Sequence, residues 1–103
     1  LFPGRPDQVG TQDVCPGDAI IDFRYEWGNG ATELVIEGLN AAYTATPGIG
    51  GAVNPIIGQP NWYRVTGTDE VTISGTAGPS NYFRVRTDGS GCTEAQDDYF
   101  IEV

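Results

Sequence analysis

The 103-residue sequence contains no lysine, no histidine and no methionine. Without histidine, a Ser-His-Asp or Cys-His catalytic arrangement is impossible, and so is any zinc site that uses a histidine ligand. The two cysteines, Cys15 and Cys92, are too few for a four-cysteine zinc site. Because methionine is missing even at position 1, we expect a processed product or a segment of something longer.

Basic residues are scarce as well. All five are arginine, against 14 acidic residues, and the net charge is −9. Nucleic-acid-binding proteins neutralise phosphates with clustered Lys and Arg, so this balance argues against nucleic acid as a partner. It argues equally against docking on an anionic membrane surface. No apolar run approaches the roughly 18 residues of a membrane span, so we expect no membrane insertion.

Apolar and polar residues alternate along most of the chain, which is the period of a β-strand. The clearest alternation runs from Ile21 to Trp27, with one aliphatic and aromatic face and one charged face. Short runs bounded by Gly, Pro, Asn or Asp predict further strands at 33–37, 41–46, 62–66, 70–74, 81–87 and 98–103, and a weaker one near 8–14. Seven or eight short strands at this spacing predict an all-β fold, namely a single sandwich of antiparallel strands.

The segment from Pro47 to Pro60 breaks this alternation, because it is too rich in Gly and Pro for a central strand. Its apolar residues predict a loop that packs, either on an open edge of its own sandwich or on a neighbouring domain. Residues 1–7 look like a linker or N-terminal arm, and the sandwich is expected to span 8–103. Such a unit can be joined end to end with copies of itself, so the expected partners are neighbouring copies of the same module, covalent or assembled.

The two cysteines lie near the two ends of the chain. An acidic, lysine-free chain fits an oxidising extracellular setting, where Cys15 and Cys92 would form one disulfide. On the chain-entropy description, that bridge would stabilise the fold by about 4 kcal/mol. Two free, buried cysteines are the alternative.

Five runs in order carry a family resemblance: VCPGDAI (14–20), YEWGNGAT (25–32), VIEGLNA (35–41), VTISGT (71–76) and YFRVRT…GCTEA…IEV (82–103). Together they resemble the immunoglobulin-like (PKD-like) repeat found in tandem in giant secreted surface adhesins of Bacteroidetes. The resemblance implies an immunoglobulin-like sandwich that serves as a non-catalytic structural module of an extracellular adhesin or filament at the bacterial cell surface. The module would serve to space and stiffen the protein, and to support attachment or gliding of the cell.

The chain departs from that repeat in two places. Asn40 stands where the repeat has proline, and the segment 45–63 is longer than the family pattern. An added contact or function is therefore expected in the longer segment.

Carboxylates are the only groups that suggest chemistry. Asp97 and Asp98 would lie near Asp88 if the last two strands pair, and calcium takes several carboxylate oxygens. A solvated acidic face that confers solubility is the alternative, since no Asp-x-Asp-x-Asp-Gly loop is present. Carboxylates on a strand surface lack the burial that tunes a general acid or base, so we expect no catalytic residue, no enzyme activity and no cofactor other than calcium.

The adjacent aromatic residues Trp62 and Tyr63 fall on one predicted strand, so one of them should point outward. We expect Trp27 in the core, because it continues an apolar face. An outward ring could pack on a neighbouring module, with Phe2, Ile56 and Ile57 as further contact residues. The alternative is a carbohydrate-binding module that stacks surface glycans on Trp62 or Tyr63.

Overall fold

The computed structural model describes residues 11–27, 33–88 and 96–103. Within these ranges the chain forms nine β-strands and no helix, so the prediction of an all-β fold is confirmed. The strands are β1 (Thr11–Asp13), β2 (Phe23–Glu26), β3 (Glu33–Glu37), β4 (Tyr43–Pro47), β5 (Ala52–Pro55), β6 (Trp62–Thr66), β7 (Glu70–Gly75), β8 (Asn81–Asp88) and β9 (Gln96–Glu102). A search of the same ranges finds no helix of the length and apolarity that a membrane span requires.

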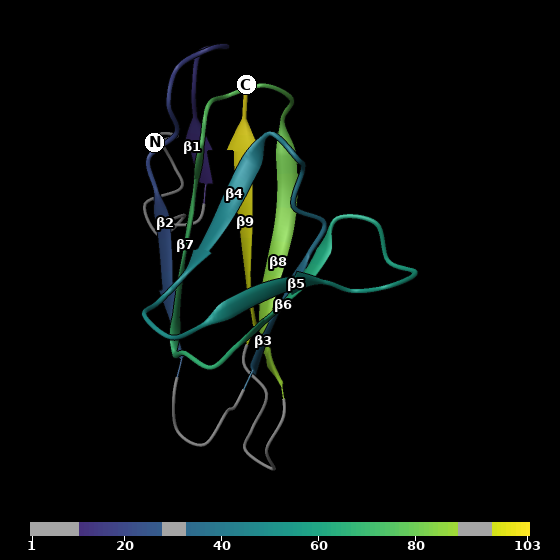
Figure 1. Cartoon of the computed structure of the whole chain (residues 1–103). Coiled ribbons are helices and arrows are strands. Elements are labelled where there is room, and N and C mark those ends of the chain that lie inside the picture. Colours follow the sequence, from purple (N-terminus) through teal and green to yellow (C-terminus); the bar gives the residue numbers. More distant parts are fainter. Residues whose placement is uncertain (1–10, 28–32, 89–95) are drawn as a thin grey trace.

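The strands form two sheets. One has six strands in the order β1-β9-β8-β3-β6-β5, and the other has three in the order β2-β7-β4. Neighbouring strands run antiparallel except β1 and β9, which run parallel, so the prediction of antiparallel strands throughout is wrong at this pair. Figure 1 shows the C-terminus at the end of β9 and the loop between β5 and β6 projecting from the side of the sandwich.

Most strands form where the alternation predicts them. β3 and β6 have the predicted bounds, and β4, β7, β8 and β9 differ from prediction by at most two residues at either end. The ends of these strands could be predicted because turn residues follow them. Gly38 and Gly67, for example, adopt positive φ angles of 84° and 76°.

β5 is the strand that the sequence did not predict. It is an edge strand that pairs with β6 on one side only. An edge strand tolerates proline, because the backbone on its free side needs no partner in the sheet. The described residues therefore form nine strands where seven or eight were expected for the chain.

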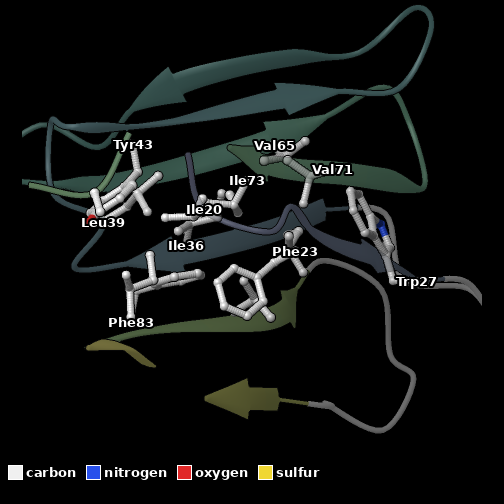
Figure 2. Packing of buried hydrophobic residues seen from close by; sticks show 14 residues of the cluster. Ile20, Phe23, Trp27, Ile36, Leu39, Tyr43, Val65, Val71, Ile73 and Phe83 are labelled. Atoms are coloured by element: carbon white, nitrogen blue, oxygen red, sulfur yellow. The ribbon is translucent and has the colours of Figure 1, made fainter. Parts of the chain in front are cut away.

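The core lies between the two sheets. Leu34, Ile36 and Val85 contribute from the larger sheet, and Phe23 and Ile73 from the smaller one. Figure 2 shows the cluster in close-up, with the Trp27 ring at one end and the side chains of Leu39 and Tyr43 at the other. Burial of Trp27 confirms its expected place. Each fully buried large side chain stabilises the fold by about 1.5–3 kcal/mol.

Gly75 lets β4 approach β7 closely. Its φ angle is 147°, and a Cβ at this position would lie 2.7 Å from the Ala42 carbonyl oxygen and 3.1 Å from the Tyr43 Cα. The first contact is too short for a side chain and the second is tight, and both involve backbone, which cannot swing aside. The close approach also seats Tyr43, whose hydroxyl donates to the Pro79 carbonyl at 2.7 Å.

Candidate functional site

The first described strand and the last strand are neighbours. β1 pairs in parallel with β9, matching Thr11 with Phe100 and Asp13 with Glu102. The Val14 amide continues the contact by donating to the Glu102 carbonyl at 2.9 Å. The β1 and β9 backbones therefore lie side by side and point the same way.

Gln12 links this pair of strands to the other sheet. Its side-chain Nε2 donates to the Ile21 carbonyl at 2.7 Å, and its Oε1 accepts from the Ile21 amide at 2.8 Å. Ile21 leads into β2, the edge of the smaller sheet, so one buried glutamine joins the edges of both sheets. This arrangement also explains why β2 begins after Ile21, two residues later than predicted.

The connection from β1 to β2 is fixed along the end of β7. The Gly17 amide donates to the Ala77 carbonyl at 2.8 Å, the Ala77 amide to the Asp18 carbonyl at 2.7 Å, and the Ile20 amide to the Gly75 carbonyl at 2.9 Å. Backbone hydrogen bonds thus fix the segment that follows β1.

Three of the five arginines lie on the outer face of the six-stranded sheet. Their ion pairs join Arg64 to Glu33 and Asp88, Arg84 to Asp98, and Arg86 to Glu37. Pairs at this degree of exposure contribute about 0–1 kcal/mol each. Their larger effect is to offset part of the negative charge on this face.

Val35 lies beneath these ion pairs. It alternates with the core residues Leu34 and Ile36 and therefore points outward, yet it is 0% exposed. Its cross-strand neighbours are Arg64 and Arg86, whose aliphatic stems can cover an apolar side chain while their charged ends remain in water.

The structure does not bring the three candidate calcium ligands together. Asp98 accepts from Arg84 at 2.7 Å, and hydrogen bonds from Arg84 and Tyr82 lower the pKa of Asp98. Asp88 instead accepts from Arg64 at 2.9 Å.

Asp97 alternates with Asp98 along β9 and interacts with two half-buried tyrosines. Burial, with Asp97 as the next cause, raises the pKa of Tyr25, and burial with the same carboxylate raises the pKa of Tyr99 to about 12. The part of the chain that the structure describes holds no group of three or more Cys, Asp or Glu side chains placed to bind a metal ion.

The expected disulfide is not supported. Cys15 is an exposed free thiol, and Cys92 lies outside the described residues. Cys15 follows β1 at the end where Asp13 pairs with Glu102.

The predicted contact residues separate into three groups. Trp62 is half-exposed on the outer face, whereas Tyr63 faces inward and packs against the core. Ile57 is 98% exposed and Ile56 is half-buried. Phe2 lies outside the described residues, as does the whole expected linker.

The sequence prediction missed the feature that connects several of these residues. No charged residue occurs between Glu37 and Arg64, in a chain with 14 acidic and five basic residues. We call this stretch, residues 38–63, the neutral side; it contains β4, β5 and the loop that leads to β6. The uninterrupted absence of charge was visible in the sequence and is the signal that could have found it.

No family model, no curated protein and no solved structure matches the chain.

Proposed function

We propose that this chain is a non-catalytic, immunoglobulin-like structural module of an extracellular surface protein or filament. Its work would be mechanical: to space and stiffen an array of copies at a bacterial cell surface. The observation that carries the proposal is the parallel pairing of the first described strand with the last.

Parallel terminal strands resist tension in a particular way. Force applied toward the chain ends pulls β1 from its Thr11 end and β9 from its Glu102 end, in opposite directions along the strands. The hydrogen bonds between them are then loaded together in shear and cannot open one after another. Gln12 adds resistance, because its two hydrogen bonds to Ile21 share the load with the other sheet.

The pairing of six strands supports the immunoglobulin-like part of the proposal. The triplets β2-β7-β4 and β9-β8-β3 have the arrangement of strands B-E-D and G-F-C. β6 and β5 extend the second triplet, as strands C′ and C″ do in variable-type domains, but here the chain visits β4 before them. This departure coincides with the segment that is longer than the resembling repeat.

Single-molecule pulling of several copies joined end to end tests the proposal. Val14→Pro removes the amide that donates to the Glu102 carbonyl across the terminal strands. Ile56→Pro is the matched control, because it removes an amide that donates to the Trp62 carbonyl at 3.0 Å, in the β5–β6 hairpin outside the path of the force. We expect Val14→Pro to lower the unfolding force and Ile56→Pro to leave it near the wild-type value.

Chemical denaturation of both variants separates force resistance from equilibrium stability, since forced unfolding follows the unfolding rate. Equal losses of unfolding force in the two variants would refute the mechanical role of the terminal strands.

Glycan binding is the second candidate function, and the half-exposed ring of Trp62 favours it. Trp62 lies opposite Glu37 in the outer face, so polar groups stand beside a ring that could stack on a sugar. Titration with soluble glycans while Trp fluorescence is recorded tests this candidate. Trp62→Phe should weaken any change observed, whereas Tyr63→Phe, which alters an inward residue, should not.

A further inference from the structure

The neutral side carries an uncharged hollow lined by both apolar and polar side chains. It has a volume of about 250 Å³, and Leu39, Tyr43, Thr44, Ala45, Val53 and Tyr63 line it. The hollow lies where β4 and β5, the edge strands of the two sheets, come near each other. We call it the Tyr43 hollow. An apolar cavity of about 150 Å³ already accepts a benzene molecule, so this one has room for a branched aliphatic side chain.

The neutral side also carries an apolar projection. Ile57 lies in the loop between β5 and β6, which stands away from the sandwich in Figure 1, and its side chain is 98% exposed. The other residues of this loop, 56–61, are uncharged; Pro55 immediately precedes the loop and Pro60 lies within it. Within the described chain, no neighbouring group shields the Ile57 side chain from water.

The distribution of charge in the chain indicates which partner the neutral side can bind. The chain has a net charge of −9, and all its charged residues lie outside the neutral side. Two copies therefore repel each other over most approaches, and the neutral side is where they can meet without setting carboxylate against carboxylate. A basic partner would be drawn to the acidic surfaces elsewhere.

We propose that the neutral side is a self-association surface, in which Ile57 of one copy enters the Tyr43 hollow of another. Ile57, which we call the knob, and the Tyr43 hollow are two different surfaces of the same chain. The contact is therefore heterologous and can repeat from copy to copy. This inference specifies the partner as a second copy of the chain. It rests on the proposed function only for its biological setting, an array of such modules.

Sedimentation velocity of the separate domain tests the association, over concentrations from about 10 μM to about 1 mM, the range of a weak contact. We expect larger species to grow with concentration and to be favoured at about 0.5 M NaCl over about 0.02 M, because salt screens the repulsion between acidic copies but not an apolar contact. An association held by ion pairs would weaken with salt and would overturn the proposal, as would a monomer under every condition.

Two variants probe the two halves of the contact. Ile57→Ser removes the knob and should weaken association roughly tenfold to a hundredfold, the effect of leaving one isoleucine unburied. Thr44→Glu places a carboxylate at the exposed rim of the hollow and should weaken it comparably. Ile21→Ser is the matched control, since Ile21 is 75% exposed but lies outside the neutral side. Association unchanged in Ile57→Ser, or equally weakened in Ile21→Ser, would overturn the proposal.

Mixing the two variants gives the sharpest test. The Ile57→Ser copy keeps an intact hollow and the Thr44→Glu copy keeps an intact Ile57, so the mixture should associate more strongly than either variant alone. A mixture that stays monomeric would refute the pairing of knob with hollow. Because none of these measurements involves pulling on the chain, their outcome is independent of the mechanical role of the terminal strands.

Discussion

Replacing Gln12 with alanine tests whether one side chain couples the two sheets. The Gln12 side chain is buried and makes two hydrogen bonds to the Ile21 backbone, at 2.7 and 2.8 Å. Gln12→Ala deletes both bonds at once and leaves the amide and carbonyl of Ile21 without their protein partners. The perturbation is local, because residue 12 keeps its backbone pairing with Ile101 in β9.

The expected cost follows from these contacts. Each hydrogen bond contributes about 1 kcal/mol net, and the buried methylene that is lost contributes about 0.8 kcal/mol. Because the Ile21 side chain is 75% exposed, water can reach the orphaned groups, so their full desolvation penalty does not apply. The sum is about 2–3 kcal/mol, which corresponds to a fall in Tm of roughly 10–20 °C for a domain of this size.

Equilibrium unfolding in urea, followed by Trp fluorescence and circular dichroism, measures this change. The midpoint should fall while the slope m stays constant. Gln59→Ala is the matched control, because it makes the same chemical change at an exposed loop position and should alter stability by no more than about 0.5 kcal/mol. Equal effects of Gln12→Ala and Gln59→Ala would refute the coupling of the sheets through Gln12.

Three further predictions concern single residues. Gly75→Ala should destabilise the fold by about 3 kcal/mol or more in urea unfolding, because its Cβ would overlap backbone, whereas Gly58→Ala, with a positive φ but open space around it, should cost about 1 kcal/mol. The hydrogen bond from Arg84 lowers the pKa of Asp98 in the folded protein. Asp98 therefore stabilises the fold above its unfolded pKa near 3.9, and this contribution is lost as pH falls through the lower folded value. Asp98→Asn should flatten the acid limb of a plot of Tm against pH, and an unaltered limb would contradict the assignment. Cys15 should react with maleimide in the folded protein, and Cys15→Ser should abolish labelling at that position; mass spectrometry that finds residue 15 oxidised and unlabelled would restore the disulfide.

Local pattern was sufficient for most of the fold. β3 and β6 were predictable residue by residue because each is a short apolar run that ends at a turn glycine, and both signals lie within a few residues of each other. The alternation rule also separated Trp62 from Tyr63, although not which of them faces out. β5 could not be predicted from the same rules, since Ala52–Pro55 is a strand only because the edge of β6 is there to receive it.

Pairing between distant strands was the information that the sequence lacked. Whether β1 runs parallel or antiparallel to β9 leaves the alternation of both strands unchanged, yet it decides which end of the sheet Cys15 occupies. The contacts of the carboxylates likewise depend on pairing between distant strands. Asp97 and Asp98 are adjacent in sequence, but alternation sends them to opposite faces, where Asp98 meets Arg84 and Asp97 meets Tyr99.

Charge distribution links the two proposals. The arginines that the chain does have are concentrated where they pair with carboxylates on the outer face, and the stretch 38–63 has neither sign of charge. Repulsion between copies is therefore expected to be weakest at the neutral side, so the same acidity that keeps the modules apart also restricts how they can meet. If copies are joined end to end through β1 and β9, contacts through Ile57 would connect neighbouring arrays sideways. Tension along the chain and cohesion between chains would then rest on different strands, which is why variants at Val14 and at Ile57 should each change one property and leave the other as it is.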